Sequence, residues 1–465
     1  MKLSLLLATE RRAISGLALL YAFRMLGLFM VLPVLSLYAG HLEYATPALI
    51  GIALGGYGLT QALLQIPFGL LSDRIGRKVV IAGGLLLFLI GSIVAAEATT
   101  IYGVIAGRCL QGSGAIAGAI MALLADRTRE EVRTTAMATI GMSIGIAFAI
   151  AMVVGPLIAH TLGLAGVFWA TAALAMIGLL VLWRFVPAAP LRRHRDVGLN
   201  REQLRTTLVH PNLLRLDFSI LSLHMLLTAC FVAVPVKLVA LGIAPEDHGW
   251  VYLAVMGCGF VTMIPMIIAA EKYRHMKMIF TATVGTLAVI LFSMSLLPSN
   301  SWMLVILLGL FFVAFNFLEA TLPSMISKLA PAGAKGTAMS IYSTSQFLGA
   351  SIGGAGGGMI AGFYGENAVF LFASCIALLW LLVIWRMPAP RHLSSEIIAL
   401  NEDAIKTSDV LVERFAAIAG VEDVLIVPEE RVAYLKVDRT LLDTEALAQI
   451  TERKGMAMSA PSTSF

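Results

Sequence analysis

The chain has 465 residues, of which 59% are hydrophobic and 13% are charged, with a formal net charge of +5. Because about a quarter of the residues of a soluble protein are charged, this composition excludes an ordinary soluble protein and indicates one that lies in a bilayer. The positive charge does not indicate nucleic-acid binding, since the basic residues lie in short loops between apolar runs, where they set membrane orientation.

Apolar runs long enough to span a bilayer recur along most of the chain. The predicted spans are 14–38, 48–70, 79–97, 101–125, 135–158, 165–186, 212–238, 249–270, 278–297, 301–327, 336–362 and 366–387. Basic residues gather in the loops on one side of these spans, which predicts that both termini are cytoplasmic. The first run is too long for a signal peptide and is expected to remain as a helix.

An internal repeat is indicated by three short matches about 200 residues apart, the length of one six-helix half. They pair Pro33 with Pro235, Pro67 with Pro265, and Thr135 with Thr337. We therefore expect an N-terminal half over 1–186, a cytoplasmic linker over 187–211 and a C-terminal half over 212–387. Parallel halves of this kind normally enclose a site near the bilayer midplane.

After Pro390 the composition becomes that of a soluble protein. Residues 395–455 predict the order β-α-β-β-α, with room for a last short strand, which is the ferredoxin-like plan. Residues 456–465 are expected to be a disordered tail. The predicted fold class is an all-α membrane protein of two six-helix halves with a small α+β ferredoxin-like cytoplasmic domain.

The second span ends in GLLSDRIGRKVVI, a short turn with opposite charges. Gly69 is expected to allow close helix contact. Asp73 lies where the next helix begins, and this position favours a negative charge. Arg77 can reach a carboxylate of a neighbouring helix, which predicts a latch. The alternative is that these are only orientation-setting charges with a turn glycine. The residues of the predicted latch are Gly69, Asp73, Gly76, Arg77, Lys78 and Asp126.

This string resembles the G-x-L-x-D-r-x-G-r-k signature of the major facilitator superfamily. The resemblance implies a loop that stabilises the outward-facing state through charge contacts with the fourth helix and the other half. The equivalent loop of the second half lacks both glycines, so only the first half should form the full latch.

Two further segments resemble motifs of the same superfamily. GRCLQGSGAIAGA in the fourth span resembles the segment of proton-driven members in which an arginine, here Arg108, is linked to proton transfer. The fifth span resembles the glycine-proline element of antiporters, although Ala159 and His160 replace its last glycine pair. Ordinary glycine packing with a proline kink is the alternative. The residues of this antiporter motif are Gly141, Gly145, Gly155 and Pro156.

The twelve spans with a soluble tail, together with FRMLGLFMVLPVL and YSTSQFLG, resemble a group of drug-proton antiporters within that superfamily. The resemblance implies a multi-pass protein of a bacterial inner membrane. The tail of that group is similar to heavy-metal-associated domains, which bind metal through Cys-x-x-Cys. Residues 388–465 contain no cysteine and a single histidine, His392, so we predict that this domain binds no metal.

Three charged or titratable residues lie at midplane depth, namely Arg24, His224 and Glu319. Such residues are functional candidates by default because burying them in lipid is costly. Glu319 is the first choice for the exchangeable proton and His224 the second, with a core histidine as its alternative. Together with Arg108, these residues form the predicted proton-coupling set. Asp217, nearer the inner surface beside Arg215, is interpreted as a solvated or paired end group.

A polar series in the spans is predicted to line a substrate cavity among Met and Phe side chains, which suit amphipathic substrates. The alternative is that these polar residues join helices. The series is Gln61, Gln65, Asn316, Tyr342 and Gln346.

The leading hypothesis is a monomeric proton antiporter that exports small amphipathic molecules by alternating access. A metabolite or sugar symporter or uniporter of the same fold remains open, as does a non-transporting sensor that signals through its C-terminal domain. No phosphate-binding loop or hydrolase motif is present, so we expect neither an ATP-driven pump nor an enzyme. The expected partners are the substrate, protons and the lipid bilayer, and no cofactor is expected beyond the proton gradient.

Overall fold

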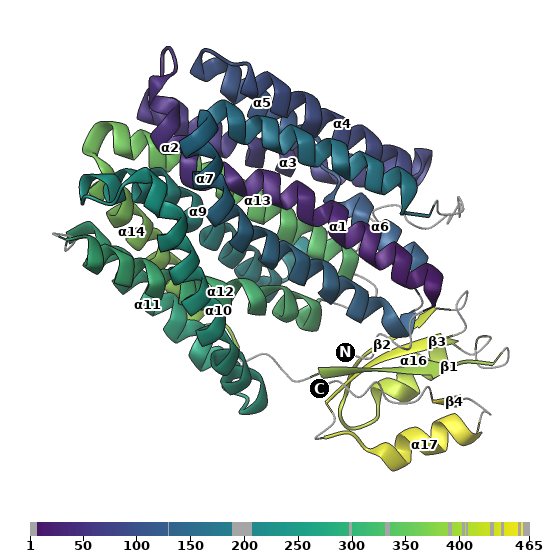
Figure 1. The fold of residues 1–465 in the computed structure, drawn as a ribbon. Coiled ribbons are helices and arrows are strands. Elements are labelled where there is room, and N and C mark those ends of the chain that lie inside the picture. The colour runs from purple at the N-terminus through teal and green to yellow at the C-terminus, as the bar shows by residue number, and fades with distance from the viewer. Residues whose placement is uncertain are drawn as a thin grey trace. The chain divides into compact units, whose positions relative to one another are not determined.

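A computed structural model describes most of the chain, and the membrane body is helical throughout (Figure 1). The described residues are 7–128, 130–187, 207–296, 300–330, 335–388, 393–401, 405, 408–427, 432–438, 441–453 and 457–458. Most of the predicted linker and the last residues of the predicted tail, 459–465, lie outside this set.

The helices of the body follow the order of the predicted spans. They are α1 (Ala8–Met30), α2 (Leu32–Tyr38), η2 (Ala39–His41), α3 (Pro47–Ile75), α4 (Arg77–Ala96), α5 (Ile101–Ser113), α6 (Ala117–Arg127), α7 (Glu130–Arg184), α9 (Pro211–Ala240), η3 (Pro245–Asp247), α10 (His248–Lys272), α11 (Met276–Leu296), α12 (Ser301–Leu329), α13 (Lys335–Tyr364) and α14 (Glu366–Trp385).

Ten helical segments among the described residues are long and apolar enough to cross a membrane, compared with twelve predicted spans. The difference has two causes. The predicted fifth and sixth spans are joined in α7, whose 55 residues are interrupted only at Gly163, with φ 68° and ψ −172°. The predicted eleventh span is the 30-residue α13, which is not one of the ten because its many glycine and polar residues lower its mean hydropathy.

Two predicted spans are each divided into two helices. The first is interrupted at Val31, just before Pro33 in the first turn of α2. The fourth is interrupted between Ser113, the last residue of α5, and Ala117, the first of α6. Broken helices near the midplane free backbone groups that need partners within the protein.

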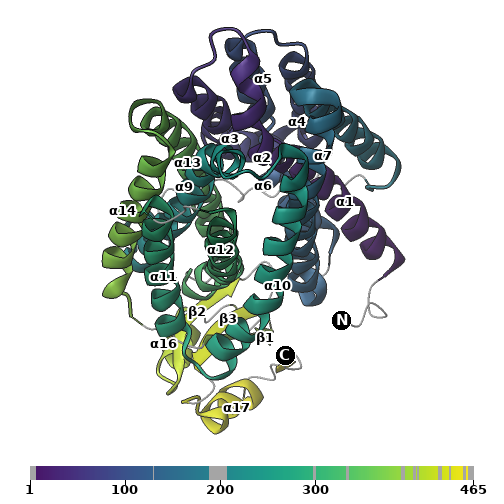
Figure 2. The same ribbon diagram turned by 60° about the vertical axis from the view of Figure 1, so that its left-hand side comes forward.

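The helices gather in two groups, α1–α7 and α9–α14, and α3 meets α13 where the groups join (Figure 2). Glycines bring these two backbones into contact. A Cβ on Gly51 would lie 2.3 Å from the carbonyl oxygen of Gly354, and one on Gly55 would lie 2.5 Å from that of Ser351. This layout is consistent with the two predicted halves.

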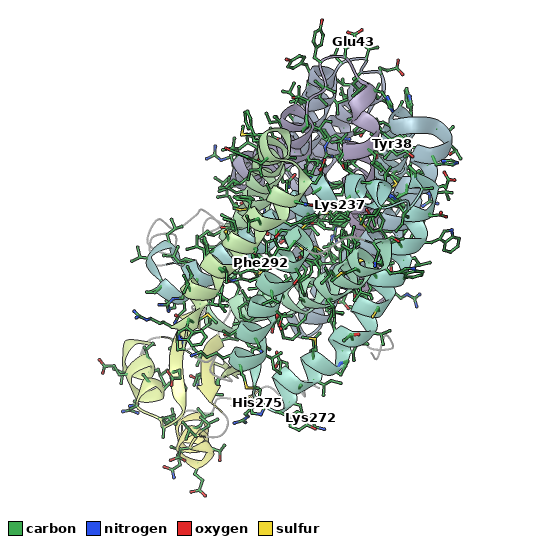
Figure 3. The ribbon with its side chains drawn as sticks, turned by 90° about the vertical axis from the view of Figure 1, so that its left-hand side faces the viewer. Tyr38, Glu43, Lys237, Lys272, His275 and Phe292 are labelled. Carbon is green, nitrogen blue, oxygen red and sulfur yellow. The ribbon has the colours of Figure 1, made fainter. Side chains whose placement is uncertain are left out.

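The two ends of the body carry the loops that the sequence assigns to opposite sides of the membrane. Glu43, in a predicted outer loop, lies at one end, and Lys272 and His275, in a predicted inner loop, lie at the other (Figure 3). Large apolar side chains remain exposed between the ends, among them Val261 in the middle of α10 and Val289 in the middle of α11. An apolar surface of this extent is stable against lipid rather than water.

The C-terminal segment forms a separate sheet with its own core. Its elements are β1 (Leu393–Ala399), α16 (Ser408–Ala416), β2 (Val421–Val427), β3 (Val432–Asp438), α17 (Thr444–Arg453) and β4 (Ala457–Met458). The strand order is β2-β3-β1-β4, and every described pair is antiparallel. Phe415 and Leu435 are fully buried in this core. Ala457 and Met458 pair with β1, so the predicted disordered tail is wrong for these two residues.

Candidate functional site

The predicted latch residues Asp73, Arg77 and Asp126 meet at the start of α4. Arg77 forms an ion pair with Asp73 of α3, and its Nε lies 3.4 Å from Oδ2 of Asp126 on α6. Its Nη1 also donates to the hydroxyl of Ser72 at 2.7 Å. One guanidinium therefore joins three helices at one end of the N-terminal half.

The turn that places Arg77 depends on Gly76, whose φ of 104° is a backbone conformation that favours glycine. Lys78, the next residue but one, donates from Nζ to the carbonyl oxygen of Val186 at 2.9 Å, just beyond α7. Gly69 does not have its predicted role, because a Cβ there would meet nothing within 4 Å. It lies about four to five turns beyond Gly51 and Gly55 on α3, past the close contacts that these two glycines make.

The four residues of the predicted antiporter motif lie on α7 but differ in packing. A Cβ on Gly155 would lie 2.6 Å from the carbonyl oxygen of Met30, so this glycine allows α7 to contact α1. Gly141 and Gly145 have nothing within 4 Å of a Cβ, and Pro156 lies inside the helix. Close packing therefore explains Gly155 but not the two earlier glycines.

Arg24 is buried among helices of the N-terminal half. Its Nη2 donates to Tyr57 Oη at 2.9 Å, to Gln61 Oε1 at 2.7 Å and to the carbonyl oxygen of Gly114 at 2.8 Å. Gly114 lies in the break between α5 and α6, so the arginine supplies a partner to a backbone group that the break has freed. Its Nε and Nη1 have no hydrogen-bond partner among the described residues.

Arg108 lies on the other side of Tyr57 and is equally buried. Its guanidinium carbon is 5.1 Å from the centre of the Tyr57 ring, and its Nη1 donates to Gln111 Oε1 at 3.0 Å. Gln111 in turn donates to Ser92 Oγ at 2.8 Å. The ion pairs of the described residues include neither Arg24 nor Arg108.

The sequence analysis missed Tyr57, which both arginines contact. The only signal for it is its position one helical turn before Gln61 on α3.

His224, Glu319 and Gln346 meet in the C-terminal half, from α9, α12 and α13. Nε2 of His224 lies 3.1 Å from Oε2 of Glu319, and Nε2 of Gln346 donates to Oε1 of the same carboxyl group at 3.2 Å. Gln346 Nε2 is also 2.8 Å from His224 Nε2. Two members of the predicted proton-coupling set are thus in contact, while Arg24 and Arg108 belong to a separate cluster in the other half.

The contact between His224 and Glu319 depends on the imidazole tautomer. A neutral imidazole with its hydrogen on Nε2 donates to the ionised carboxylate, whereas with the hydrogen on Nδ1 both facing atoms are acceptors. The Glu319 side chain is 35% exposed and that of His224 is 11% exposed. The two side chains thus form a hydrogen-bonded pair of titratable groups, in which the glutamate is partly exposed and the histidine is nearly buried.

Aromatic side chains surround this pair. The ring of Phe315 lies 6.0 Å from that of His224. Phe148 of α7 lies 6.2 Å from Phe315 and 6.3 Å from Phe312, both on α12. The two halves therefore touch through an apolar wall beside the carboxyl group.

The residues of the predicted cavity series belong to different contact clusters. Gln61 and Gln65 are buried in the Arg24 cluster, where Gln61 Nε2 donates to Gln65 Oε1 at 3.3 Å. Gln346 belongs to the His224 cluster. Asn316 and Tyr342 are buried, and Asn316 Nδ2 and Tyr342 Oη lack hydrogen-bond partners among the described residues.

Asp217 is not the solvated or paired end group that the sequence suggested. It is buried, and its Oδ1 has no hydrogen-bond partner among the described residues. Arg215 instead donates to Asn212 Oδ1 at 2.8 Å. The signal for Asp217 is its spacing of seven residues from His224, which places both on one face of α9.

Comparisons with known proteins agree with this architecture. The sequence profile of the Major Facilitator Superfamily matches residues 17–239 and 216–428. The chain is 50% identical over 430 residues to the inner membrane transport protein YajR of Escherichia coli K12, covering 92% of this chain and 94% of that protein. It is 26% identical over 315 residues to the multidrug resistance protein MdtL of the same species, covering 66% and 78%.

A crystal structure of a D-xylose-proton symporter has the same fold, with a TM-score of 0.67 at 16% identity over 82% of this chain and 98% of that one. The chain therefore belongs to the Major Facilitator Superfamily. This confirms the resemblance that the loop signature and the half repeat indicated.

Proposed function

We propose that the chain is a proton-coupled transporter that exports small amphipathic molecules by alternating access. The observation that carries the proposal is the hydrogen-bonded contact between two titratable side chains, His224 and Glu319, inside the helical body. Acidic and histidine side chains inside membrane spans are typical of proton pathways in transporters. The name of MdtL, a multidrug resistance protein, supports a drug-like substrate.

Antiport follows from competition for one carboxyl group. When Glu319 is ionised, it offers a negative charge beside the aromatic wall of Phe315, Phe312 and Phe148, which suits a substrate with a cationic and an apolar part. When Glu319 takes up a proton, that attraction is lost and the substrate leaves. One proton crossing a potential of about 100 mV supplies about 2.3 kcal/mol to this exchange.

We assign the remaining predicted residues to supporting roles. The latch of Asp73, Arg77 and Asp126 stabilises one of the two states that alternate. Arg24 and Arg108 contribute to coupling as buried positive charges that form no ion pair within the described part of the chain, since such charges respond strongly to a proton or a substrate charge between the halves.

Location and domain organisation complete the proposal. The name of YajR and the basic inner loops support a bacterial inner membrane protein, acting as a monomer with both termini cytoplasmic. The strand order β2-β3-β1-β4, with helices after the first and third strands, supports a ferredoxin-like C-terminal domain. The absence of cysteine from residues 388–465 supports a domain without a metal.

The test is proton release from energised inverted membrane vesicles when tetraphenylphosphonium, ethidium or a small neutral drug is added. Vesicles with the wild-type protein should release protons, and vesicles with Glu319→Gln should not. Glu97→Gln is the matched control, because Glu97 is an exposed carboxylate outside the site. Release that persists in Glu319→Gln would contradict the proposed proton site. If no compound triggers release, uptake assays would decide between a symporter and a sensor.

A further inference from the structure

We propose that Asp217 and Tyr342 form a relay that carries protons between the His224–Glu319 pair and the inner ends of α9 and α13. The inference rests on the proposed function, because it supplies the route to the proposed proton site. It adds two residues that the sequence had interpreted differently, one as an end group and one as part of the substrate cavity.

The first leg of the route lies on α9. Asp217 and His224 are seven residues apart, which is about two turns, so they lie on one face about 10 Å apart along the helix. Asp217 is about 9 Å from the start of α9 at Pro211, and His224 about 20 Å. The carboxyl group thus lies between the helix end and the proposed proton site.

Tyr342 is the second residue of the proposed route and lies on a second helix, α13. It lies on α13, one turn before Gln346, which hydrogen-bonds Glu319. Helices α9 and α13 run side by side, because a Cβ on Gly349 would lie 2.0 Å from the Leu221 carbonyl oxygen and one on Gly353 would lie 2.2 Å from that of Met225. By helix rise, Tyr342 is about 10 Å from the start of α13, and Gln346 about 16 Å. In this register the tyrosine lies within about one turn of Asp217 along the two helices, and one turn before Gln346.

Asp217 and Tyr342 each have an unsatisfied buried polar atom. Oδ1 of Asp217 and Oη of Tyr342 are buried polar atoms without a hydrogen-bond partner among the described residues. Such atoms are rare in native proteins and are usually satisfied by ordered water. Water between these groups would complete a chain of hydrogen-bonding groups through an otherwise apolar region.

The transfer needs no other reactant. Asp217 takes a proton from water, and its carboxyl group passes that proton through bridging water to the Tyr342 hydroxyl. This hydroxyl accepts a proton at its oxygen while it gives its own to water beside Glu319, so the tyrosine ends unchanged. Glu319 and His224 then hold the proton between them. The titratable groups along this route are Asp217 and His224 on α9, Glu319 on α12 and Tyr342 on α13.

The experiment measures how fast Glu319 becomes protonated. The purified full-length protein in lipid nanodiscs receives protons from a photolabile donor, and time-resolved infrared spectroscopy follows the carboxyl band that Glu319→Gln removes. We expect Asp217→Asn and Tyr342→Phe each to slow this band by about 10²-fold, a typical effect of removing a positioned proton-transfer group. Asp217→Glu keeps a carboxyl group and should restore a rate close to that of the wild type.

Tyr252→Phe is the matched control. Tyr252 is also fully buried in the C-terminal half with an unpartnered hydroxyl, but it lies on α10 near the opposite end of the body. A wild-type rate in both Asp217→Asn and Tyr342→Phe would overturn the relay, and so would equal slowing by Tyr252→Phe. If the wild type shows no band that Glu319→Gln removes, the proposed proton site itself fails, which is a different result from an unchanged rate.

Discussion

Nε2 of His224 and Oε2 of Glu319 lie 3.1 Å apart, although the residues are 95 positions apart in the chain. The contact joins α9 to α12 and leaves about a third of the Glu319 side chain exposed. Because both side chains are titratable, a proton gained or lost by the pair changes the charge inside the C-terminal half. The predictions below test this pair and the elements that support it.

Replacing His224 by glutamine should separate proton sharing from folding. Glutamine can keep a hydrogen bond to Glu319, so we expect the free energy of unfolding to change by less than about 1 kcal/mol. The variant lacks a titratable ring, and proton-driven export should fall by about tenfold or more. Thermal unfolding in detergent and transport in vesicles measure the two effects. Unchanged export would show that Glu319 acts without the histidine.

Arg24 should be essential for the stability of the N-terminal half. Arg24→Met removes the arginine donor from Tyr57 Oη and Gln61 Oε1, and leaves the Gly114 carbonyl oxygen with the Ile116 N–H alone. Since each unsatisfied buried group costs about 1–3 kcal/mol, we expect a loss of about 3 kcal/mol or more in the free energy of unfolding. Arg12→Met is the control, because Arg12 makes an exposed hydrogen bond to Arg184. Equal unfolding midpoints for the two variants would contradict this role.

The latch should affect transport more than stability. Arg77→Ala removes two ion pairs that are partly exposed, and such pairs contribute about 0–1 kcal/mol each. We expect the unfolding temperature to change little. The transport rate should drop, because the latch no longer stabilises one of the two alternating states. Arg74→Ala is the matched control, as Arg74 is exposed on the same turn. A similar transport rate in both variants would argue for a topological role of these charges alone.

The glycine contact between α3 and α13 should be required for closing one end of the body. Gly354→Val would place side-chain atoms against the backbone of Gly51 and Gly55, whereas a Cβ on Gly257 meets nothing within 4 Å. We expect spin labels at the exposed residues Tyr44 and Phe363 to move apart in Gly354→Val and to stay as in the wild type in Gly257→Val. Unchanged label distances in Gly354→Val would rule out a closing role.

Apolar length and glycine content made most of the body predictable. The predicted spans follow the helices closely, although two spans share α7 and two others are each divided, because backbone polar groups in lipid must be satisfied within the segment. The charged loop was also predictable in detail, since Asp73 and Arg77 are neighbours on the chain and Asp126 ends the fourth span. The strands and helices of the C-terminal domain followed from their alternating and helical patterns.

The features that were missed depend on tertiary partners. The break between α5 and α6 is stabilised by Arg24, which lies 90 residues away from Gly114 in the chain. The burial of Asp217 could not be predicted from its neighbour Arg215, because that arginine donates a hydrogen bond to Asn212. For Gly69 the sequence predicted a close helix contact that the structure does not contain, since a glycine permits close packing but does not cause it.

The most direct test of proton coupling at Glu319 uses proteoliposomes loaded with tetraphenylphosphonium. A pH gradient imposed across the membrane should drive its transport by the wild-type protein. In Glu319→Gln, gradient-driven transport should fall to the level of protein-free liposomes, while exchange of labelled for unlabelled compound continues without a gradient. Gradient-driven transport by Glu319→Gln at the wild-type rate would contradict the account, because the His224–Glu319 pair would then not carry the coupled proton.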